Sequence, residues 1–480
     1  MVLSMGRLSF MDVAMNSPTL LLSLGIVALL IWRLWRFTVR PLCIWLAGKR
    51  LYIVTSPEDN TLLNRNTTTV SFETMVVGMY RDIGISSHGV EVFFNKASVP
   101  LGKDTAAKRP LDAILEFHKR QLTPGRNEFD VLMSSKVLPC IENTMDFTRA
   151  KGGEPFVLDT TPEATTVSLL RMCEEIFIVG VPDAFLGMDW FKSNPEMWKA
   201  WLDWERVNWK VIFDLPAALT RDMVAAREQI VDSYVQYLRV PSAERSEASY
   251  FIKSLDTVMQ RVDASETDTA RVLLLQTWAI TGNLYKVAFW AVSFMAHDQS
   301  LLESIRTEIL PVVRGEKIDE SYLYEKCPEL KSLIVEVMRV TIASGLVRDV
   351  IAPTVVGGKT LMPGSRVLVP YRQLHLDRDA WGENAHTMDP RRFVRDAKLE
   401  NSKSYLPFGS GHTLCPGRFF AKRAASYFIA LLVSKYDLRL KDEGARFPRM
   451  DLATPAPGVP LPRNGDDVIL VLKERPKPCK

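Results

Sequence analysis

One cysteine stands in a stretch whose composition suits it to bind a metal. Residues 405–418 read Tyr-Leu-Pro-Phe-Gly-Ser-Gly-His-Thr-Leu-Cys-Pro-Gly-Arg, with two glycines before Cys415 and a Pro-Gly pair directly after it. A glycine-framed turn that leads into a helix holds one sulfur rigidly beside free backbone N–H groups, which favour the thiolate. We therefore expect Cys415 to be an anionic metal ligand rather than an inert buried thiol.

The other cysteines show no comparable pattern. The chain has 6 cysteines, scattered without a C-x-x-C pair: Cys43, Cys140, Cys173, Cys327, Cys415 and Cys479. This arrangement argues against a zinc ribbon and against a disulfide scaffold, and it fits a reducing compartment.

The composition describes a large folded chain with balanced charge. Its 480 residues are 47% hydrophobic and 24% charged, enough apolar material for a sizeable core. Lys and Arg number 60 against 56 Asp and Glu, a net charge of +4 with no strongly basic run. Nucleic-acid binding is therefore not expected.

The hydrophobic pattern predicts a mainly α protein with a small β region. Residues 100–345 are helical in pattern, and the segment 269–296, with only two charged residues, predicts one long helix buried on most sides. Tryptophans 190, 198, 201, 204 and 209 follow a helical rhythm that predicts core packing. Beyond residue 345, the runs 350–356 and 366–370 predict small strands, and 417–435 predicts a last helix.

The amino-terminal segment predicts a membrane anchor. Residues 13–32 carry no charge, and about 1.5 Å per residue makes them long enough for one bilayer core. Arg33, Arg36 and Arg40 follow, whereas only Arg7 precedes, which places the carboxyl-terminal side in the cytosol. A cleaved signal peptide is the alternative, although no A-x-A site follows. The expected organisation is an anchor in 1–36 and one catalytic domain in 37–480.

The cysteine loop carries a family resemblance. The pattern Phe408-x-x-Gly411-x-x-x-Cys415-x-Gly417 resembles the haem-binding signature of the cytochrome P450 superfamily, and Cys-Pro-Gly-Arg-Phe-Phe-Ala is a form frequent in its fungal members. The resemblance implies the cytochrome P450 fold and haem b as cofactor. It makes Cys415 the proximal iron ligand and places Phe408 and Gly411 against the haem.

One position departs from that signature. Thr413 stands where the family usually has an Arg or His that binds a haem propionate, so His412 or Arg348 is expected to serve instead. The family's W-x-x-x-R of the propionate-binding helix is also missing, and the run 118–120, His-Lys-Arg, is a weak substitute for it.

The family's Glu-x-x-Arg and Pro-x-Arg-Phe marks both have matches. Of three Glu-x-x-Arg pairs, only Glu336/Arg339 sits on an apolar helix upstream of small strands and the cysteine loop. Pro390-Arg-Arg-Phe393 supplies Arg392, which the resemblance joins to that pair in one buried ion network on the proximal side. The pairs Glu303/Arg306 and Glu443/Arg446 are expected to be solvated.

The central helix departs from the usual acid and alcohol over the distal haem face. Thr281-Gly282-Asn283 stands there, similar to the prostacyclin synthase and sterol 7α-hydroxylase branches of the family, whose chemistries differ. An Asn amide can hold a water that passes protons, orient a peroxide oxygen, or cap a kink in the helix. Asn283 and Thr281 are the residues expected on the oxygen side.

The resemblance implies a membrane-anchored haem-thiolate monooxygenase of the endoplasmic reticulum membrane. It would oxidise a lipophilic small molecule, such as a terpenoid, steroid-like or other secondary metabolite, with O2 and electrons from NADPH delivered by NADPH-cytochrome P450 reductase. The reductase would dock on a basic face formed by Lys403, Arg418, Lys422 and Arg423. Two alternatives are a reductase-independent isomerase of a peroxide or epoxide, and a haem-based sensor or carrier.

Overall fold

The computed structural model describes residues 42–46, 49–95, 107–147, 153–212, 215–314 and 317–476. The chain divides into two compact units. The smaller contains the described part of residues 1–71 together with 347–370, and the larger contains the described part of 72–346 and 371–480. The predicted span 13–32 lies outside the described residues, and no helix within them has the length and apolar character needed to cross a membrane.

The smaller unit is built on a five-stranded sheet in the order β1-β2-β11-β8-β3. Its elements are β1 Leu42–Leu46, β2 Lys49–Ile53, α3 Pro57–Arg65, β3 Val70–Ser71, β8 Gly345–Val350, β9 Thr354–Val356, β10 Lys359–Leu361 and β11 Arg366–Pro370. β2 and β11 run parallel, with Tyr52 opposite Val367, and β9 pairs with β10 as a hairpin. The predicted strand 366–370 is therefore confirmed, whereas 350–356 is divided between the end of β8 and β9.

The larger unit contains the helices and the remaining strands. Its longer helices are α4 Glu73–Asp82, α5 Ser87–Asn95, α6 Pro110–Leu122, α11 Pro195–Val207, α12 Arg221–Arg239, α13 Tyr250–Arg261, α14 Glu266–Thr281, α15 Leu284–His297, α16 Gln299–Ile309, α18 Pro328–Thr341 and α22 Arg418–Lys435. Shorter ones are α7 Asn127–Leu132, α8 Leu138–Thr144, α9 Leu169–Glu174, α10 Val181–Leu186, α17 Glu320–Lys326, α19 Tyr371–His375, α20 Arg378–Trp381 and α21 Arg392–Arg395.

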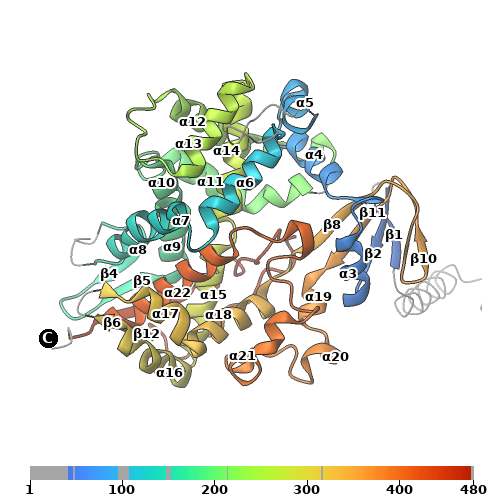
Figure 1. Ribbon diagram of the computed structural model, residues 1–480. Helices are drawn as coiled ribbons and strands as arrows, with labels where there is room; N and C mark the ends of the chain where they lie inside the picture. Colours follow the sequence, from blue (N-terminus) through green and yellow to red (C-terminus); the bar gives the residue numbers. More distant parts are fainter. Residues whose placement is uncertain are drawn as a thin grey trace, which may run out of the picture. The chain divides into compact units, whose positions relative to one another are not determined.

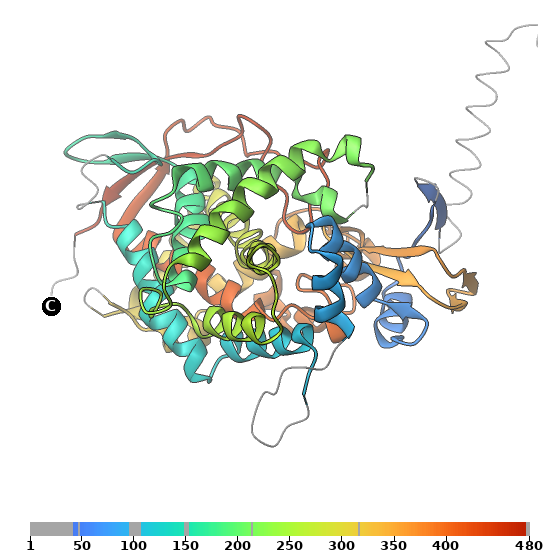
Figure 2. The same ribbon diagram turned by 90° about the horizontal axis from the view of Figure 1, so that it is seen from above.

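Strands from distant parts of the sequence meet at one edge of this unit. β4 Val157–Thr160, β5 Thr165–Ser168, β12 Tyr436–Leu440 and β13 Ile469–Glu474 form a sheet in the order β12-β13-β5-β4, while β6 Val313–Arg314 and β7 Lys317–Ile318 form a separate pair. In Figure 2 the teal strands β4 and β5 lie beside the red strands β12 and β13. Most elements of the described residues are helices and the strands are short, which confirms the prediction of a mainly α protein with a small β region.

Three helices that carry or directly follow predicted site residues pack together. Figure 1 shows α15, α18 and α22 side by side, and each contacts the other two. α18 begins with Pro328 at its first turn, where a missing N–H costs nothing, and carries Glu329 beside the helix amino terminus. α22 is buried from Ala424 to Val433, which places it in the core of the unit.

The predicted long helix is interrupted in its middle. α14 ends at Thr281 and α15 begins at Leu284, with Gly282 and Asn283 between them. Asn283 has φ −125° and ψ −29°, outside the helical region, although its carbonyl still accepts the Val287 N–H at 3.0 Å. The prediction of one continuous helix over 269–296 was therefore wrong, and the break falls at the Gly-Asn pair.

Arg306 also differs from expectation. It is buried, and besides Glu303 it reaches the carbonyls of Val433 and Tyr436 at 3.4 and 3.5 Å, at the carboxyl end of α22. A guanidinium there satisfies terminal carbonyls and favours the helix dipole. The prediction of a solvated Glu303/Arg306 pair was wrong, whereas Glu443 and Arg446 are both exposed.

Candidate functional site

The cysteine loop is held by its own backbone. The Cys415 N–H donates to the Phe408 carbonyl at 2.9 Å, and the Arg418 guanidinium donates to the Cys415 carbonyl at 3.0 Å. Gly411 opens a short 3₁₀ turn, Gly411–Thr413, between these anchors. Gly409 and Gly411 have φ of +76° and +61°, a region that other residues adopt only with strain. These glycines let the chain double back so that the sulfur is presented just before α22.

The Cys415 thiol is half-buried in the loop. Burial raises the pKa of its thiol, while the Gly417 N–H and the Arg418 guanidinium act in the opposite direction. The helix-end effect expected from the sequence is thus present but is smaller than the effect of desolvation. A bound metal ion deprotonates a coordinating thiol outright, so a thiolate there depends on the metal.

The residues around Cys415 fit a flat apolar cofactor. Leu414 and Phe419 flank the loop with exposed fractions of 41% and 38%, although the rest of α22 is mostly buried. A porphyrin lying against the sulfur would cover such side chains. Phe408 is half-buried, with the Lys422 ammonium 5.9 Å from its ring centroid. The single thiolate ligand and the glycine-formed loop therefore fit haem.

The structure brings Glu336, Arg339 and Arg392 together. Glu336 and Arg339 form a two-pronged ion pair with both N–O distances at 2.7 Å, and neither side chain is exposed at all. Arg392 donates to the same carboxylate at 3.2 Å, and the Asp389 N–H donates to it at 3.0 Å. We call these residues the Glu336 network.

Backbone carbonyls satisfy the remaining donors of the network. Arg339 donates to the carbonyls of His375 at 2.7 Å, Ala385 at 2.5 Å and Thr387 at 3.1 Å. Arg392 donates to the Trp381 carbonyl at 3.1 Å and to Asn384. Buried charges of this kind are stable only when their hydrogen bonds are complete, and here they tie α18 to the segment 375–395.

His375 links this network to the cysteine loop, and the sequence reasoning missed it. Its Nε2 accepts the Leu406 N–H at 2.8 Å, nine residues before the cysteine. Burial, assisted by the nearby charge of Arg339, lowers the pKa of His375 to about 3, so the ring is neutral and Nε2 can accept. A lone histidine has no sequence signal for this role, because Leu406 is far from it along the chain.

The two residues expected on the oxygen side have different surroundings. Thr281 is completely buried, and its hydroxyl donates to the Thr277 carbonyl of its own helix at 2.9 Å. This contact is typical of a structural threonine, and it leaves Thr281 no open face. Asn283 is exposed, as is Ala279 four residues earlier, and its Oδ1 accepts the Val459 N–H at 2.8 Å.

The residues expected to bind the haem propionates have different surroundings. His412 is exposed in the cysteine loop. Arg348 lies in β8 of the smaller unit, where it is buried and donates to the Val347 carbonyl at 2.8 Å. His118 is buried against Gln276 and stacked on Phe251 at 4.3 Å, and burial lowers its pKa to about 4. A neutral, enclosed His118 is unsuited to bind a carboxylate.

A buried ion pair beside the helix break was also missed. The Lys286 ammonium lies 2.9 Å from a Glu205 oxygen that also accepts the Tyr285 hydroxyl at 2.9 Å. Asn208 donates to the other oxygen at 3.1 Å, and burial raises the pKa of nearby Glu174 to about 7. The only sequence signal was the presence of Lys286 in an otherwise apolar segment, because its partner is 81 residues away.

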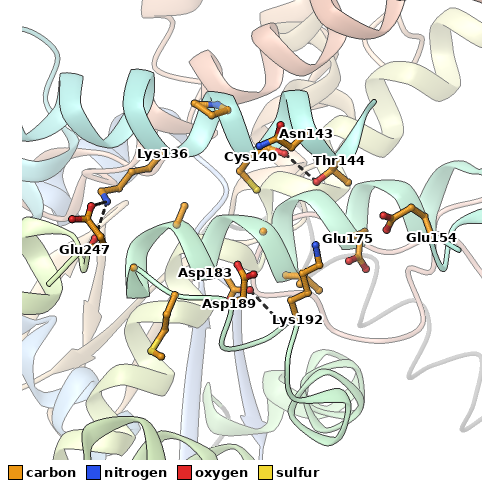
Figure 3. A pocket seen from close by; sticks show the side chains of 16 residues that line it. Lys136, Cys140, Asn143, Thr144, Glu154, Glu175, Asp183, Asp189, Lys192 and Glu247 are labelled. Atoms are coloured by element: carbon orange, nitrogen blue, oxygen red, sulfur yellow. Dashed lines mark hydrogen bonds and ion pairs between the residues drawn. The ribbon is translucent and has the colours of Figure 1, made fainter. Parts of the chain in front are cut away.

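A separate cavity of about 410 Å³ lies between α8 and the helical segment 175–186. Figure 3 shows its polar lining, in which Lys136 is paired with Glu247 at 3.1 Å. Asp183 accepts the backbone N–H groups of residues 191 and 192. None of the sequence-predicted site residues lines it. The cavity is therefore distinct from the cysteine loop and the helix break.

Comparison with known families agrees with this geometry. The sequence profile described as Cytochrome P450 matches residues 105–464, which include the helix break, the Glu336 network and the cysteine loop. The chain belongs to the cytochrome P450 family. The resemblance noted on the cysteine loop is thereby confirmed.

Similar cytochrome P450 proteins come from animals and fungi. Prostacyclin synthase of Rattus norvegicus is 27% identical over 236 residues, 44% of this chain and 46% of that protein. Cytochrome P450 7A1 of Sus scrofa is 27% identical over 269 residues, 50% of this chain and 51% of that protein. Cytochrome P450 monooxygenase nodJ of Hypoxylon pulicicidum is 22% identical over 413 residues, 81% and 74% respectively. The chain therefore spans about half the length of the prostacyclin synthases that it matches.

A solved cytochrome P450 structure shows the same fold. The cyanobacterial CYP120A1 with bound retinoic acid matches with a TM-score of 0.68 over 91% of this chain and 92% of that one, at 16% identity. At this identity the similarity shows the fold alone.

Proposed function

We propose that the protein is a membrane-anchored haem-thiolate monooxygenase that oxidises a lipophilic small molecule of the terpenoid, steroid-like or other secondary-metabolite class. The observation that carries the proposal is the Cys415 loop, which presents one sulfur between exposed Leu414 and Phe419 in a chain of this family. Haem ligated by a thiolate supplies oxygen activation with O–O cleavage. Electrons would come from NADPH through NADPH-cytochrome P450 reductase.

The residues of this chain would divide the work of holding the cofactor. Cys415 would ligate the iron, Phe408 and Gly411 would lie against the haem, and His412 or Arg348 would pair with a propionate. The Glu336 network would keep the loop rigid through His375 and its bond to the Leu406 N–H. A positioned ligand needs such supporting contacts to stay within a few tenths of an ångström.

A membrane location is supported by the sequence. The uncharged segment 13–32 and the arginines that follow it fit a single-pass anchor in the endoplasmic reticulum membrane, with the catalytic domain in the cytosol. A lipophilic substrate would then reach the protein from the bilayer. The proposed monooxygenase activity is supported by the similarity to nodJ, named a cytochrome P450 monooxygenase.

The proposed basic surface for the reductase has fewer available residues than the sequence alone suggested. Lys403 is exposed, but Lys422 lies 3.6 Å from Glu400 and Arg418 is engaged with the cysteine loop. Arg423 lies over the rings of Phe129 and Tyr324 at 5.2 and 4.7 Å. The docking face would therefore depend mainly on Lys403 and on the accessible part of Lys422.

A second function is favoured by one observation at the helix break. Gly282 and Asn283 provide neither a carboxylic acid nor a hydroxyl there, and three of the similar proteins are prostacyclin synthases. The alternative is a haem-thiolate isomerase of a peroxide or epoxide that needs no reductase. An amide can orient a peroxide oxygen by hydrogen bonding but does not titrate near neutral pH.

One experiment separates the two functions. Metabolites of a host carrying the wild-type gene are compared with those of a host carrying Cys415→Ala, to find the compound that is consumed. The purified protein is then given that compound with ¹⁸O-labelled dioxygen, reductase and NADPH. Label in the product together with NADPH dependence supports the monooxygenase, whereas unlabelled product formed without NADPH supports the isomerase. Unchanged metabolites in the Cys415→Ala strain would contradict both.

A further inference from the structure

The loop between Met450 and Pro462 is closed at its base and bonded at three points to the helix break, to α15 and to the residues that follow α18. At its base, Asp451 N–H donates to the Leu461 carbonyl at 2.8 Å. Farther along, Asn283 Oδ1 accepts the Val459 N–H at 2.8 Å, the Gly458 carbonyl accepts the Ala343 N–H at 2.8 Å, and the Trp290 indole donates to the Pro460 carbonyl at 2.9 Å. The segment 458–460 is buried, whereas residues 452–455 are exposed. These hydrogen bonds therefore hold residues 458–460 in place, while residues 452–455 on the other side of the loop are exposed.

The fit between Asn283 and Gly458 is unusually close. A Cβ at position 458 would lie 1.8 Å from Asn283 Oδ1 and 2.6 Å from its Nδ2. Real Cβ atoms do not approach other atoms so closely, so any larger residue would push the amide away. Gly458 and Asn283 thus form a matched pair, in which the absent side chain makes room for the amide that binds the next residue.

We propose that Asn283 is a positioning residue that latches the loop 451–461 to the break between α14 and α15. The latch fixes the loop as one wall of the open face that Asn283 and Ala279 present, and so contributes to substrate selection. The inference rests on the proposed function only in taking that open face as the substrate side. Asn283 acts through the loop rather than as a proton carrier.

The orientation of the amide supports this assignment. Because a backbone N–H must meet the amide oxygen, Oδ1 points to Val459 and the NH2 group points away from it. The side-chain carbonyl of Asn283 therefore serves the loop.

Hydrogen exchange of the full-length haem protein tests the latch without any substrate. Prolines at 455, 457, 460 and 462 leave few amides in this loop, so exchange at Val459 can be resolved. Asn283→Ala and Gly458→Ala should each raise the Val459 exchange rate by about tenfold, because one net hydrogen bond is lost. Asn283→Asp keeps an acceptor and should exchange like the wild type.

Ser293→Ala is the matched control. Ser293 lies on the same helix and donates to the Phe289 carbonyl at 2.7 Å without touching the loop, so its loss should leave Val459 unchanged. Unchanged exchange in Asn283→Ala, or equally fast exchange in Asn283→Asp, would overturn the latch. The carbon-monoxide spectrum of each reduced variant reports haem-thiolate ligation separately, so failure of the proposed function is distinguished from failure of the latch.

A second measurement tests the part of the loop in selection. In the metabolite-producing host, Asn283→Ala and Gly458→Ala should lose product selectivity in the same way, because both release the same wall. A change in Asn283→Ala alone would contradict the latch, since it would show that the amide acts without the loop. Unchanged product ratios in both variants would remove the loop from substrate selection.

Discussion

The Glu336 network and the helix-break region both lie in the larger unit, but their buried charges are stabilised by different partners. In the network, Glu336 and Arg339 are fully buried, and backbone carbonyls from three further residues complete their hydrogen bonds. At the break, Asn283 is exposed, while Lys286 and Glu205 form a buried pair whose further hydrogen bonds come from the side chains of Tyr285 and Asn208. The first region matches the family marks residue by residue, and the second departs from them. Under the proposed function the network supports the cofactor, and the departures from the family marks lie in the region that the substrate would meet.

Arg339→Leu should produce the largest loss of stability. It would leave the Glu336 carboxylate buried beside Arg392 alone, and three carbonyls would lose their donor. Removing one partner of a buried pair costs about 4–5 kcal/mol of the free energy of unfolding, measured by urea denaturation. Arg446→Leu is the control and should change stability by less than about 0.5 kcal/mol, because Arg446 is exposed. A loss below 1 kcal/mol in Arg339→Leu, on the order of one exposed pair, would contradict the importance of the network.

Lys286→Met should have the next largest effect. Glu205 would keep its bonds from Tyr285 and Asn208 but lose its counter-charge, at a cost of about 3–4 kcal/mol. The double change Lys286→Met with Glu205→Met should recover most of that loss, since no unpaired charge remains. A double variant that is less stable than Lys286→Met would show that the pair contributes to stability beyond neutralising its two charges. The helix-break region would then not differ from the Glu336 network in this respect.

Glu174, near Glu205, makes the stability of the helix-break region depend on pH. Burial raises the pKa of Glu174 to about 7 from the ordinary 4.5, so the folded chain binds this proton more tightly than the unfolded chain. Its contribution to stability is present below pH 4.5 and is lost as the pH rises through 7.

The measurement compares wild type with Glu174→Gln across that range. At about 1.4 kcal/mol per pKa unit, the difference in unfolding free energy between the two should change by up to about 2–3 kcal/mol from pH 4.5 to 8, with the wild type losing relative stability as the pH rises. A flat difference would mean that Glu174 is ionised throughout. Cys173→Ala, beside it on α9, is the control and should show no such dependence below pH 8, because burial raises the thiol pKa.

Local patterns in the sequence predicted much of this fold and part of its site. The glycines around Cys415, the proline that opens α18 and the apolar run of α22 act within a few residues of the structure they determine, so their effects were readable. Glu336, Arg339 and Arg392 were assigned to one network only because the family marks are known. No local pattern in the sequence indicates that Arg392 contacts Glu336.

What the sequence reasoning missed depends on contacts between distant segments. His375 meets Leu406, Glu205 meets Lys286, and Asn283 meets Val459, and each pair is brought together by packing rather than by spacing. The long helix was predicted whole because its apolar pattern continues through Gly282. The interruption lies where the Asn283 side chain accepts a hydrogen bond from the loop 451–461. Local helix propensity does not indicate this contact. Strands β1 and β2 were missed because they follow directly on the apolar segment assigned to the anchor.

The carbon-monoxide difference spectrum of the purified, reduced full-length protein tests the central claim most directly. Thiolate ligation by Cys415 predicts the long-wavelength Soret band that sulfur-bound haem iron produces with carbon monoxide. Cys415→Ala should lose that band, and Cys140→Ala, which removes another half-buried thiol, should keep it. A wild-type protein that contains haem but lacks the band, or a Cys415→Ala variant that retains it, would contradict the account.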